Sequence, residues 1–337
     1  MTEFMHQNNL MKDTFGRPIN YLRLAVTDRC NLRCFYCMPR DGISYANKNE
    51  LLTYEEMERL IRISAGLGIT KLRITGGEPF ARRNIIKFLR TTKSIDGIQK
   101  VSITTNGVLT YDYIQELKAL GIKDVNLSLD TFDPVKYKII TRRDEFDATI
   151  KTFNGLIDNG FNIKINAVIM EGLNEDDIIP LCEITREMPV SVRFIEEMPF
   201  NGTNIKPKPL KWDYKRILSV INQYFPGLET LPIAQHATSM NYKIPGALGK
   251  IGIIAAYSRI FCGSCNRIRV TPTGQIKTCL YSKNKLDIRK LLRSDMNDNE
   301  IADAIVNAVS TKEKDGFEAE KGHIHLSNMD SMASIGG

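Results

Sequence analysis

Cys30-Asn31-Leu32-Arg33-Cys34-Phe35-Tyr36-Cys37 follows closely on Tyr21–Val26, an apolar segment with the length of one β-strand. Three cysteines spaced C-x3-C-x2-C suit a [4Fe-4S] cluster in which three irons take thiolates and the fourth iron is left to bind a cofactor. A four-cysteine zinc site would need a distant fourth ligand. Tyr36, just before the last cysteine, could stack over a cofactor bound to such a cluster. The spacing therefore predicts a cluster on a long loop that follows the first strand.

Beyond this loop, apolar runs of strand length alternate with amphipathic helical patterns. Six strand–helix units in series predict parallel strands joined by crossover helices. Periodicity alone leaves a doubly wound sheet and a partial barrel open. After the sixth strand the pattern becomes irregular, with a hairpin at Pro272–Gly274, one helix from about Leu286 to Val309, and a polar tail from Thr311. The expected strands are Tyr21–Val26, Lys71–Thr75, Val101–Thr105, Val125–Asp130, Ile163–Ile169 and Val190–Ile195.

Cations interrupt four of these strands, where a parallel sheet covered on both faces is normally apolar. A buried charge without a partner costs several kcal/mol, roughly. One such cation could belong to a structural ion pair, but four from four strands predict a cationic interior that binds an anionic ligand. The third and fourth strands add hydrogen-bonding residues, among them Thr104 and Ser128. The four cations are Arg23, Arg73, Lys164 and Arg193.

A second group of cysteines, Cys262, Cys265 and Cys279, lies in the irregular region. From spacing alone, zinc with a fourth ligand such as His236 and a second [4Fe-4S] cluster both remain open. On a strand, Arg267 and Arg269 point the same way and Ile268 points oppositely. Beside a cluster, the two arginines suit an anion, because Arg grips phosphates in bidentate fashion. The seventh cysteine, Cys182, reads as a small buried hydrophobe on a helix.

Composition is that of an ordinary globular protein of 337 residues, with 42% hydrophobic and 25% charged residues. The polar N-terminus has no apolar stretch before a cleavage site, and no apolar run is long enough for a membrane span. We therefore expect a cytoplasmic protein with no membrane partner. The net charge of +7 fits either a solvated basic surface or an anionic ligand.

The cysteine motif resembles the signature of the radical S-adenosylmethionine superfamily. Gly76-Gly77-Glu78-Pro79, directly after the second strand, resembles the superfamily's motif for the aminopropyl group of the cofactor, and Ser128 resembles its ribose contact. The resemblance favours an α/β fold, a partial (β/α)6 barrel like an incomplete TIM barrel, over residues 13–228. Residues 229–337 are then a C-terminal domain that carries the second cluster and a Gly-Gly tail.

Further motifs narrow the resemblance to the GTP 3′,8-cyclase family of molybdenum-cofactor biosynthesis: Arg193-Phe194-Ile195-Glu196, Cys265-Asn266-Arg267-Ile268-Arg269, and the terminal Gly336-Gly337. The resemblance implies a lyase that uses two [4Fe-4S] clusters and S-adenosylmethionine to convert GTP into (8S)-3′,8-cyclo-7,8-dihydroguanosine 5′-triphosphate. It implies metal ligands Cys30, Cys34, Cys37, Cys262, Cys265 and Cys279, and cofactor contacts Tyr36, Gly77, Ser128 and Met198. Implied substrate contacts are Arg23, Arg73, Thr104, Lys164, Arg267, Ile268 and Arg269, and implied catalytic residues are Arg23, Arg267, Arg269, Gly336 and Gly337.

The resemblance also implies a homodimer, an electron-donor protein and a downstream enzyme that forms cyclic pyranopterin. Two other readings remain. A peptide-modifying radical enzyme with auxiliary clusters would carry more C-terminal cysteines than three. A zinc-stabilised nucleic-acid-binding protein would use the positive charge, but this sequence lacks a recognised reader motif and interleaved surface aromatic residues, so we expect no nucleic-acid partner.

Overall fold

The computed structural model describes residues 10–202, 209–283, 285–321 and 331–336. Its sheet has 12 strands in the order β12-β11-β10-β1-β2-β3-β4-β5-β6-β9-β8-β7. The six predicted strands are confirmed as parallel neighbours, with ends shifted by one or two residues. They are β1 (Tyr21–Ala25), β2 (Lys71–Thr75), β3 (Lys100–Thr105), β4 (Asp124–Ser128), β5 (Asn162–Ile169) and β6 (Ser191–Glu196).

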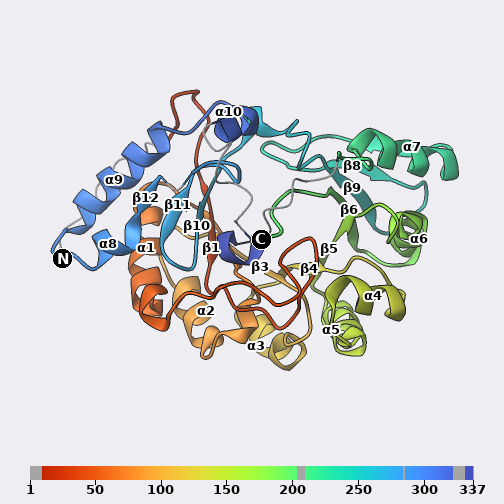
Figure 1. The fold of residues 1–337 in the computed structure, drawn as a ribbon, viewed down its shortest axis with the longest axis horizontal. Helices are drawn as coiled ribbons and strands as arrows, with labels where there is room; N and C mark the ends of the chain where they lie inside the picture. The colour runs from red at the N-terminus through yellow and green to blue at the C-terminus, as the bar shows by residue number, and fades with distance from the viewer. Residues whose placement is uncertain (1–9, 203–208, 284, 322–330, 337) are drawn as a thin grey trace.

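Crossover helices cover the outside of the curved sheet (Figure 1). The first begins at a capping box: the Thr53 hydroxyl accepts from the Glu56 amide at 3.2 Å, and the Glu56 carboxylate accepts from the Thr53 amide at 2.7 Å. The partial (β/α)6 barrel is therefore the fold. The helices are α1 (Tyr54–Gly66), α2 (Ile85–Lys93), α3 (Ile114–Ala119), α4 (Pro134–Thr141), α5 (Phe146–Asp158) and α6 (Ile178–Glu187).

Residues after β6 extend this sheet at both edges. β9 (Lys250–Ile254) pairs in parallel with β6, and β10 (Arg267–Val270) pairs in parallel with β1. Eight neighbouring strands are thus parallel, and antiparallel strands continue outward on each side to the edge strands β7 and β12. The outer elements are α7 (Tyr214–Tyr224), β7 (Glu229–Leu231), β8 (Met240–Lys243), β11 (Gln275–Lys277) and β12 (Leu286–Asp287). A boundary between two domains at residues 228 and 229 remains a prediction.

The single helix expected from Leu286 to Val309 is wrong. The chain instead forms β12, α8 (Ile288–Leu292) and α9 (Asp298–Ser310). Asp287 and Asn297 each accept backbone N–H bonds at a helix start, so capping divides the segment in two. The tail also contains α10 (Gly316–Lys321) and α11 (Met332–Ile335), which the sequence analysis did not predict.

Short 3-10 turns join several elements: η1 (Lys48–Glu50), η2 (Pro79–Ala81), η3 (Tyr111–Tyr113), η4 (Glu175–Asp177) and η5 (Cys262–Ser264). Between the strands and their helices lies one large apolar core that includes Leu22, Leu24, Leu72 and Ile74. Because side chains alternate along a strand, Arg23 and Arg73 lie on the opposite face, inside the barrel. None of the helices in the described ranges is long and apolar enough to cross a membrane.

Candidate active site

The first cysteine group lies on the loop after β1, with Cys30, Cys34 and Cys37 all reduced and half-buried. Two residues far along the chain hold the loop: Asn106, directly after β3, approaches Cys30 Sγ with its Nδ2 at 3.6 Å, and the Ser331 hydroxyl donates to the Cys37 carbonyl at 2.7 Å. Burial raises the pKa of Cys30 to about 11 and that of Cys37 to about 12, and it raises the pKa of Cys34 well above its usual range.

Such thiols ionise only when a strong cation reaches them, as metal binding provides. Within the described ranges, no three His, Cys, Asp or Glu side chains converge closely enough for a single metal ion. A [4Fe-4S] cluster binds each thiolate through a separate iron, so its ligands need not meet at one point. Three cysteine sulfurs on one loop therefore fit a cluster with one open iron.

Gly77 fixes this loop against the end of β2. Its amide donates to the Thr27 carbonyl at 2.7 Å, and an added Cβ would stand 2.6 Å from the Arg29 carbonyl carbon. Next to it, the fully buried Glu78 carboxylate accepts from the Asn106 amide at 2.8 Å and from the Thr105 hydroxyl. Burial raises the pKa of Glu78 to about 7 against these bonds. Glu78 therefore joins the end of β2 to the end of β3, beside the cysteine loop.

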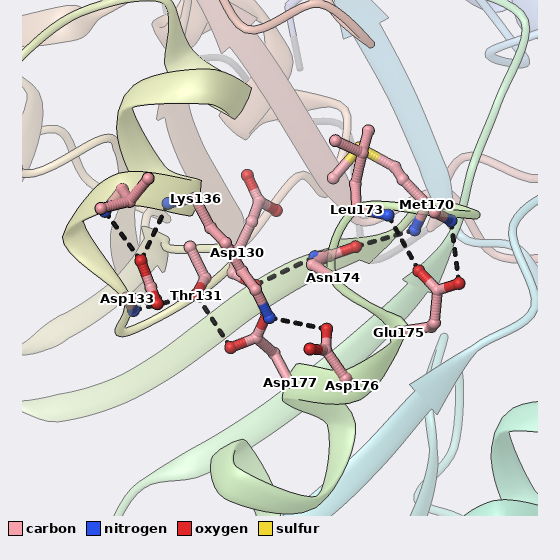
Figure 2. A network of polar contacts seen from close by, with 12 residues as sticks. Asp130, Thr131, Asp133, Lys136, Met170, Leu173, Asn174, Glu175, Asp176 and Asp177 are labelled. Atoms are coloured by element: carbon pink, nitrogen blue, oxygen red, sulfur yellow. Dashed lines mark hydrogen bonds and ion pairs between the residues drawn. The ribbon is translucent and has the colours of Figure 1, made fainter.

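Tyr36 points to the end of β4, where its hydroxyl donates to Asp130 Oδ2 at 3.0 Å. The second Asp130 oxygen accepts from the Val168 amide at 2.8 Å. Figure 2 shows the network behind it, in which Asn174 Nδ2 donates to the Asp130 carbonyl at 3.0 Å. The same nitrogen donates to the Val168 carbonyl at 2.9 Å. Thr131 continues the network to Asp177 at 2.8 Å. Because the chain grips Asp130 on both sides, Tyr36 is held in one orientation beside the cysteine loop.

Three arginines share one row across the barrel interior. Arg23 of β1 pairs in register with Arg269 of β10 and with Arg73 of β2. Burial and neighbouring arginines lower the pKa of Arg269 to about 10, and lower that of Arg23 well below its usual range. Arg73 donates to the Tyr21 hydroxyl, and to Thr104 Oγ1 at 3.3 Å.

Two further cations line the other side of the interior. Burial and Arg193 lower the pKa of Lys164 to about 8, against the opposing charge of Asp124, which lies 3.7 Å from Nζ. Burial and Arg73 lower the pKa of Arg193 to about 10. Among the described residues, the buried Nε atoms of Arg23, Arg193 and Arg267 have no hydrogen-bond partner. Buried cations that lie close together, with N–H donors that lack acceptors, are complementary to a polyanionic ligand.

The second cysteine group lies on two segments: Cys262 begins η5 and Cys265 follows it, between β9 and β10, and Cys279 comes after β11. Burial raises the pKa of Cys279 and Cys262. Burial acts in the same direction on Cys265, but Lys312 and Arg267 outweigh it and lower its pKa to about 7. His236, the alternative zinc ligand, is half-buried, and its Nδ1 lies 2.8 Å from the Ser264 carbonyl oxygen. Three thiols and a neighbouring arginine fit a cluster here also.

The C-terminal tail returns to the barrel. Figure 1 shows α11 (dark blue, beside the C mark) in the middle of the barrel opening. The Gly336 carbonyl accepts from Arg269 Nη1 at 2.8 Å, and Gly336 has φ +82°. A Cβ there would stand 2.8 Å from Ala25 Cβ and 3.0 Å from Thr75 Oγ1. Only glycine combines this backbone with this space. Gly337 lies outside the described residues.

Most of the predicted site residues come together at this opening. Ser128 ends β4, and Met198, after β6, packs against the cluster of Phe200, Tyr281, Ala319 and Ile335. Ile268 differs from its neighbours: its side chain is buried in the apolar core, because it alternates with Arg267 and Arg269, and its contact with the substrate stays a prediction. Three contacts of the site were not predicted from the sequence. Asp130 is the partner of Tyr36, and Arg17 and Lys312 lie against Cys262 and Cys265 of the second group. Asp130 was signalled by an acid at the end of an apolar strand, whereas Lys312 gave no signal within a polar tail.

Comparisons with known proteins agree with this geometry. The model of the radical SAM superfamily matches residues 24–184, and the model described as Molybdenum Cofactor Synthesis C matches residues 190–318. The chain is 40% identical to the GTP 3′,8-cyclase of Alkaliphilus metalliredigens, over 97% of this chain and 100% of that protein.

The chain is also 38% identical to Molybdenum cofactor biosynthesis protein 1 of Drosophila melanogaster, over 96% of this chain and 58% of that protein. It therefore spans little more than half the length of that relative. Among solved structures, the fold is similar to that of Streptococcus suis SuiB bound to S-adenosylmethionine, with a TM-score of 0.61 and 17% identity over 87% of this chain and 68% of that chain.

Proposed function

Because the chain belongs to the GTP 3′,8-cyclase family of radical S-adenosylmethionine enzymes, we propose that it converts GTP into (8S)-3′,8-cyclo-7,8-dihydroguanosine 5′-triphosphate, an early step of molybdenum-cofactor biosynthesis. One observation carries the proposal: Arg23, Arg73 and Arg269 form a row on the barrel interior and have no carboxylate partner within the described part of the chain, on a sheet that also carries two groups of three cysteines. Family membership implies one [4Fe-4S] cluster and S-adenosylmethionine.

Cys30, Cys34 and Cys37 hold that cluster in this proposal. The chemistry it supplies when bound is the one-electron cleavage of S-adenosylmethionine, which yields a radical that takes a hydrogen atom from the substrate. The chain's own task is placement. Tyr36, fixed by Asp130, orients the cofactor, and the backbone beside Gly77 and Ser128 at the end of β4 contact its polar groups.

The substrate's triphosphate lies against the cations of the interior. Arg23, Arg73 and Arg269 meet it from one row, and Lys164 meets it from the opposite side, with Thr104 fixed by Arg73. Arg267, whose Nε is buried and unpartnered, completes the set near the second cysteines. A triphosphate replaces the water and neutralises the mutual repulsion that lowers the pKa of these groups.

A second [4Fe-4S] cluster on Cys262, Cys265 and Cys279 is part of the proposal. Cys262, Cys265 and Cys279 would hold it, and it would supply an iron without a protein ligand for the guanine base. Gly336, held by Arg269, steers the step after hydrogen abstraction, and a catalytic role of the adjoining Gly337 stays a prediction. Dimerisation, an electron-donor protein, a downstream cyclic-pyranopterin-forming enzyme and a cytoplasmic location stay predictions.

Two assays test the proposal. The protein is purified anaerobically, and its iron, sulfide and zinc are counted. About eight irons per chain are expected for two clusters, about four would support a single cluster, and zinc alone would contradict both clusters. Reduced protein is then incubated with S-adenosylmethionine and either GTP or ATP. We expect 5′-deoxyadenosine and cyclised product only with GTP, and equal turnover of ATP would overturn the assignment of substrate.

A further inference from the structure

Lys312, in the turn after α9, is buried beside the second cysteine group, with 3% of its surface exposed. Its ammonium donates to the Arg267 carbonyl at 2.9 Å and to the Thr278 carbonyl, and it lies 3.6 Å from Cys265 Sγ. Arg267 follows Cys265 by two residues, and Thr278 directly precedes Cys279. One side chain therefore ties together the two segments that present these cysteines.

Arg17 joins the two residues after Lys312 to Cys262, the remaining cysteine of the group. Arg17, buried and paired with Asp13 at 2.5 Å, donates to the carbonyls of Glu313 and Lys314, each at 2.6 Å. The same guanidinium donates to the Cys262 carbonyl at 3.0 Å. Lys285 adds an ion pair to Glu313 at 2.5 Å. Residues 312–314 are thus fastened to each segment that carries a second-group cysteine.

The charge of Lys312 has no carboxylate partner among the ion pairs of residues 10–202, 209–283, 285–321 and 331–336. Two carbonyl dipoles stabilise a buried ammonium only in part, and a buried cation without a counterion is costly. The remaining neighbour is a cysteine sulfur. Thiolates bound to iron and sulfide would supply the missing negative charge at that position.

We propose that Lys312 is a positioning residue for an iron–sulfur cluster held by Cys262, Cys265 and Cys279. It holds the segments that carry these cysteines in place, and its positive charge stabilises the reduced form of the cluster. Hydrogen bonds to the sulfurs and nearby charge are among the factors that set a cluster's potential. This inference rests on the second cluster of the proposed function. It goes beyond that function by assigning control of the cluster to a lysine of the C-terminal tail.

The test isolates the second group by working in a parent that carries Cys30→Ala, Cys34→Ala and Cys37→Ala. In this parent we compare Lys312→Gln, Lys312→Met and Lys312→Arg, with Lys283→Met as a matched exposed lysine. Each is reconstituted anaerobically, counted for iron and sulfide, and titrated for the cluster's midpoint potential by electron paramagnetic resonance.

We expect Lys312→Gln and Lys312→Met to bind less iron and to shift the midpoint potential to more negative values, because the fixed positive charge is lost. Lys312→Arg restores the potential toward that of the parent, and Lys283→Met matches the parent. If Lys312→Met does not fold by circular dichroism, Lys312→Gln, which keeps donors to the carbonyls, decides the case. Unchanged iron content and potential in Lys312→Gln would overturn the role of Lys312, whereas a parent that binds no four-iron cluster would overturn the second cluster itself.

Discussion

At the scale of single residues, the site is defined by cations placed where a sheet would normally be apolar. Arg23 has an arginine as its registered neighbour on both sides, an arrangement that opposes folding unless an anion is bound. Arg269 also holds the Gly336 carbonyl, so it lies between the cavity and the chain's end. Substrate affinity is therefore expected to depend on these side chains individually.

Replacing Arg267 or Arg269 by Ala should weaken GTP binding about ten- to hundredfold, the range for losing a charged hydrogen bond. S-adenosylmethionine binding and iron content should stay near wild type, because the predicted cofactor contacts Tyr36 and Gly77 lie on the loops after β1 and β2, whereas both arginines lie on β10. Isothermal titration of both ligands measures the contrast, and Arg62→Ala, an exposed arginine of α1, is the control. Loss of S-adenosylmethionine binding with intact GTP binding would show that these arginines serve the cofactor and not the substrate.

GTP affinity is expected to depend on pH through Lys164. Burial lowers its pKa to about 8, so its charge is present below that pH and lost above it, and GTP affinity should fall between pH 7 and 9. Tyr21 ionises in the same range: its pKa is about 8, since Arg73 and its neighbours outweigh burial, and its anion also repels phosphate.

Binding titrations across this range separate the two groups. Lys164→Arg should flatten the decline in part, and adding Tyr21→Phe should remove the rest. Lys164→Gln should bind weakly at every pH, while Lys87→Gln, which changes an exposed lysine of α2, should keep the wild-type profile. An unchanged profile in the Lys164→Arg, Tyr21→Phe double variant would show that neither group controls binding.

At the scale of elements, glycines set how closely loops approach the barrel. Gly77→Ala should destabilise the protein by about 1–3 kcal/mol, the usual range for overpacking, because its Cβ meets the backbone of Arg29. Chemical denaturation of the metal-free protein measures this loss. Gly263→Ala, whose Cβ meets nothing within 4 Å, should cost far less. Equal stabilities would mean that the cysteine loop adjusts and does not depend on this contact.

The tail provides a second prediction for an element. Deleting Gly336 and Gly337 should leave the fold, iron content and GTP affinity nearly intact, yet remove cyclised product, because Gly336 meets Arg269 inside the opening. Gly336→Ala should impair product formation too, since its φ of +82° and the closeness of Ala25 exclude a side chain. The control is Gly160→Ala, a left-handed glycine with open space around it. Full turnover by the deleted form would return the tail to a structural role.

Much of this architecture was predictable from local patterns, because strand-length apolar runs and cysteine spacing are read within a few residues of one another. The paired caps at Asp287 and Asn297 were not, since a continuous helical pattern hid them. Contacts that join distant segments were also out of reach. Ser331 to Cys37 and Lys312 to Cys265 depend on the path of the tail, which no periodicity encodes.

At the scale of the whole molecule, one sheet brings both cysteine groups to the same cavity. The first group follows β1, and the second flanks β10, which pairs with β1. Cations of three further strands, β2, β5 and β6, lie on the inner face of the same sheet. A ligand held by the cations therefore faces both groups, which is the arrangement that a reaction between a ribose carbon and a base of one nucleotide requires.

The most direct test uses GTP that carries deuterium at ribose C3′, incubated with reduced protein and S-adenosylmethionine. Mass spectrometry of the 5′-deoxyadenosine should find deuterium transferred from the nucleotide together with cyclised product, and Cys34→Ala should form neither. Unlabelled 5′-deoxyadenosine formed at the same rate with and without GTP, or normal cleavage by Cys34→Ala, would contradict the account.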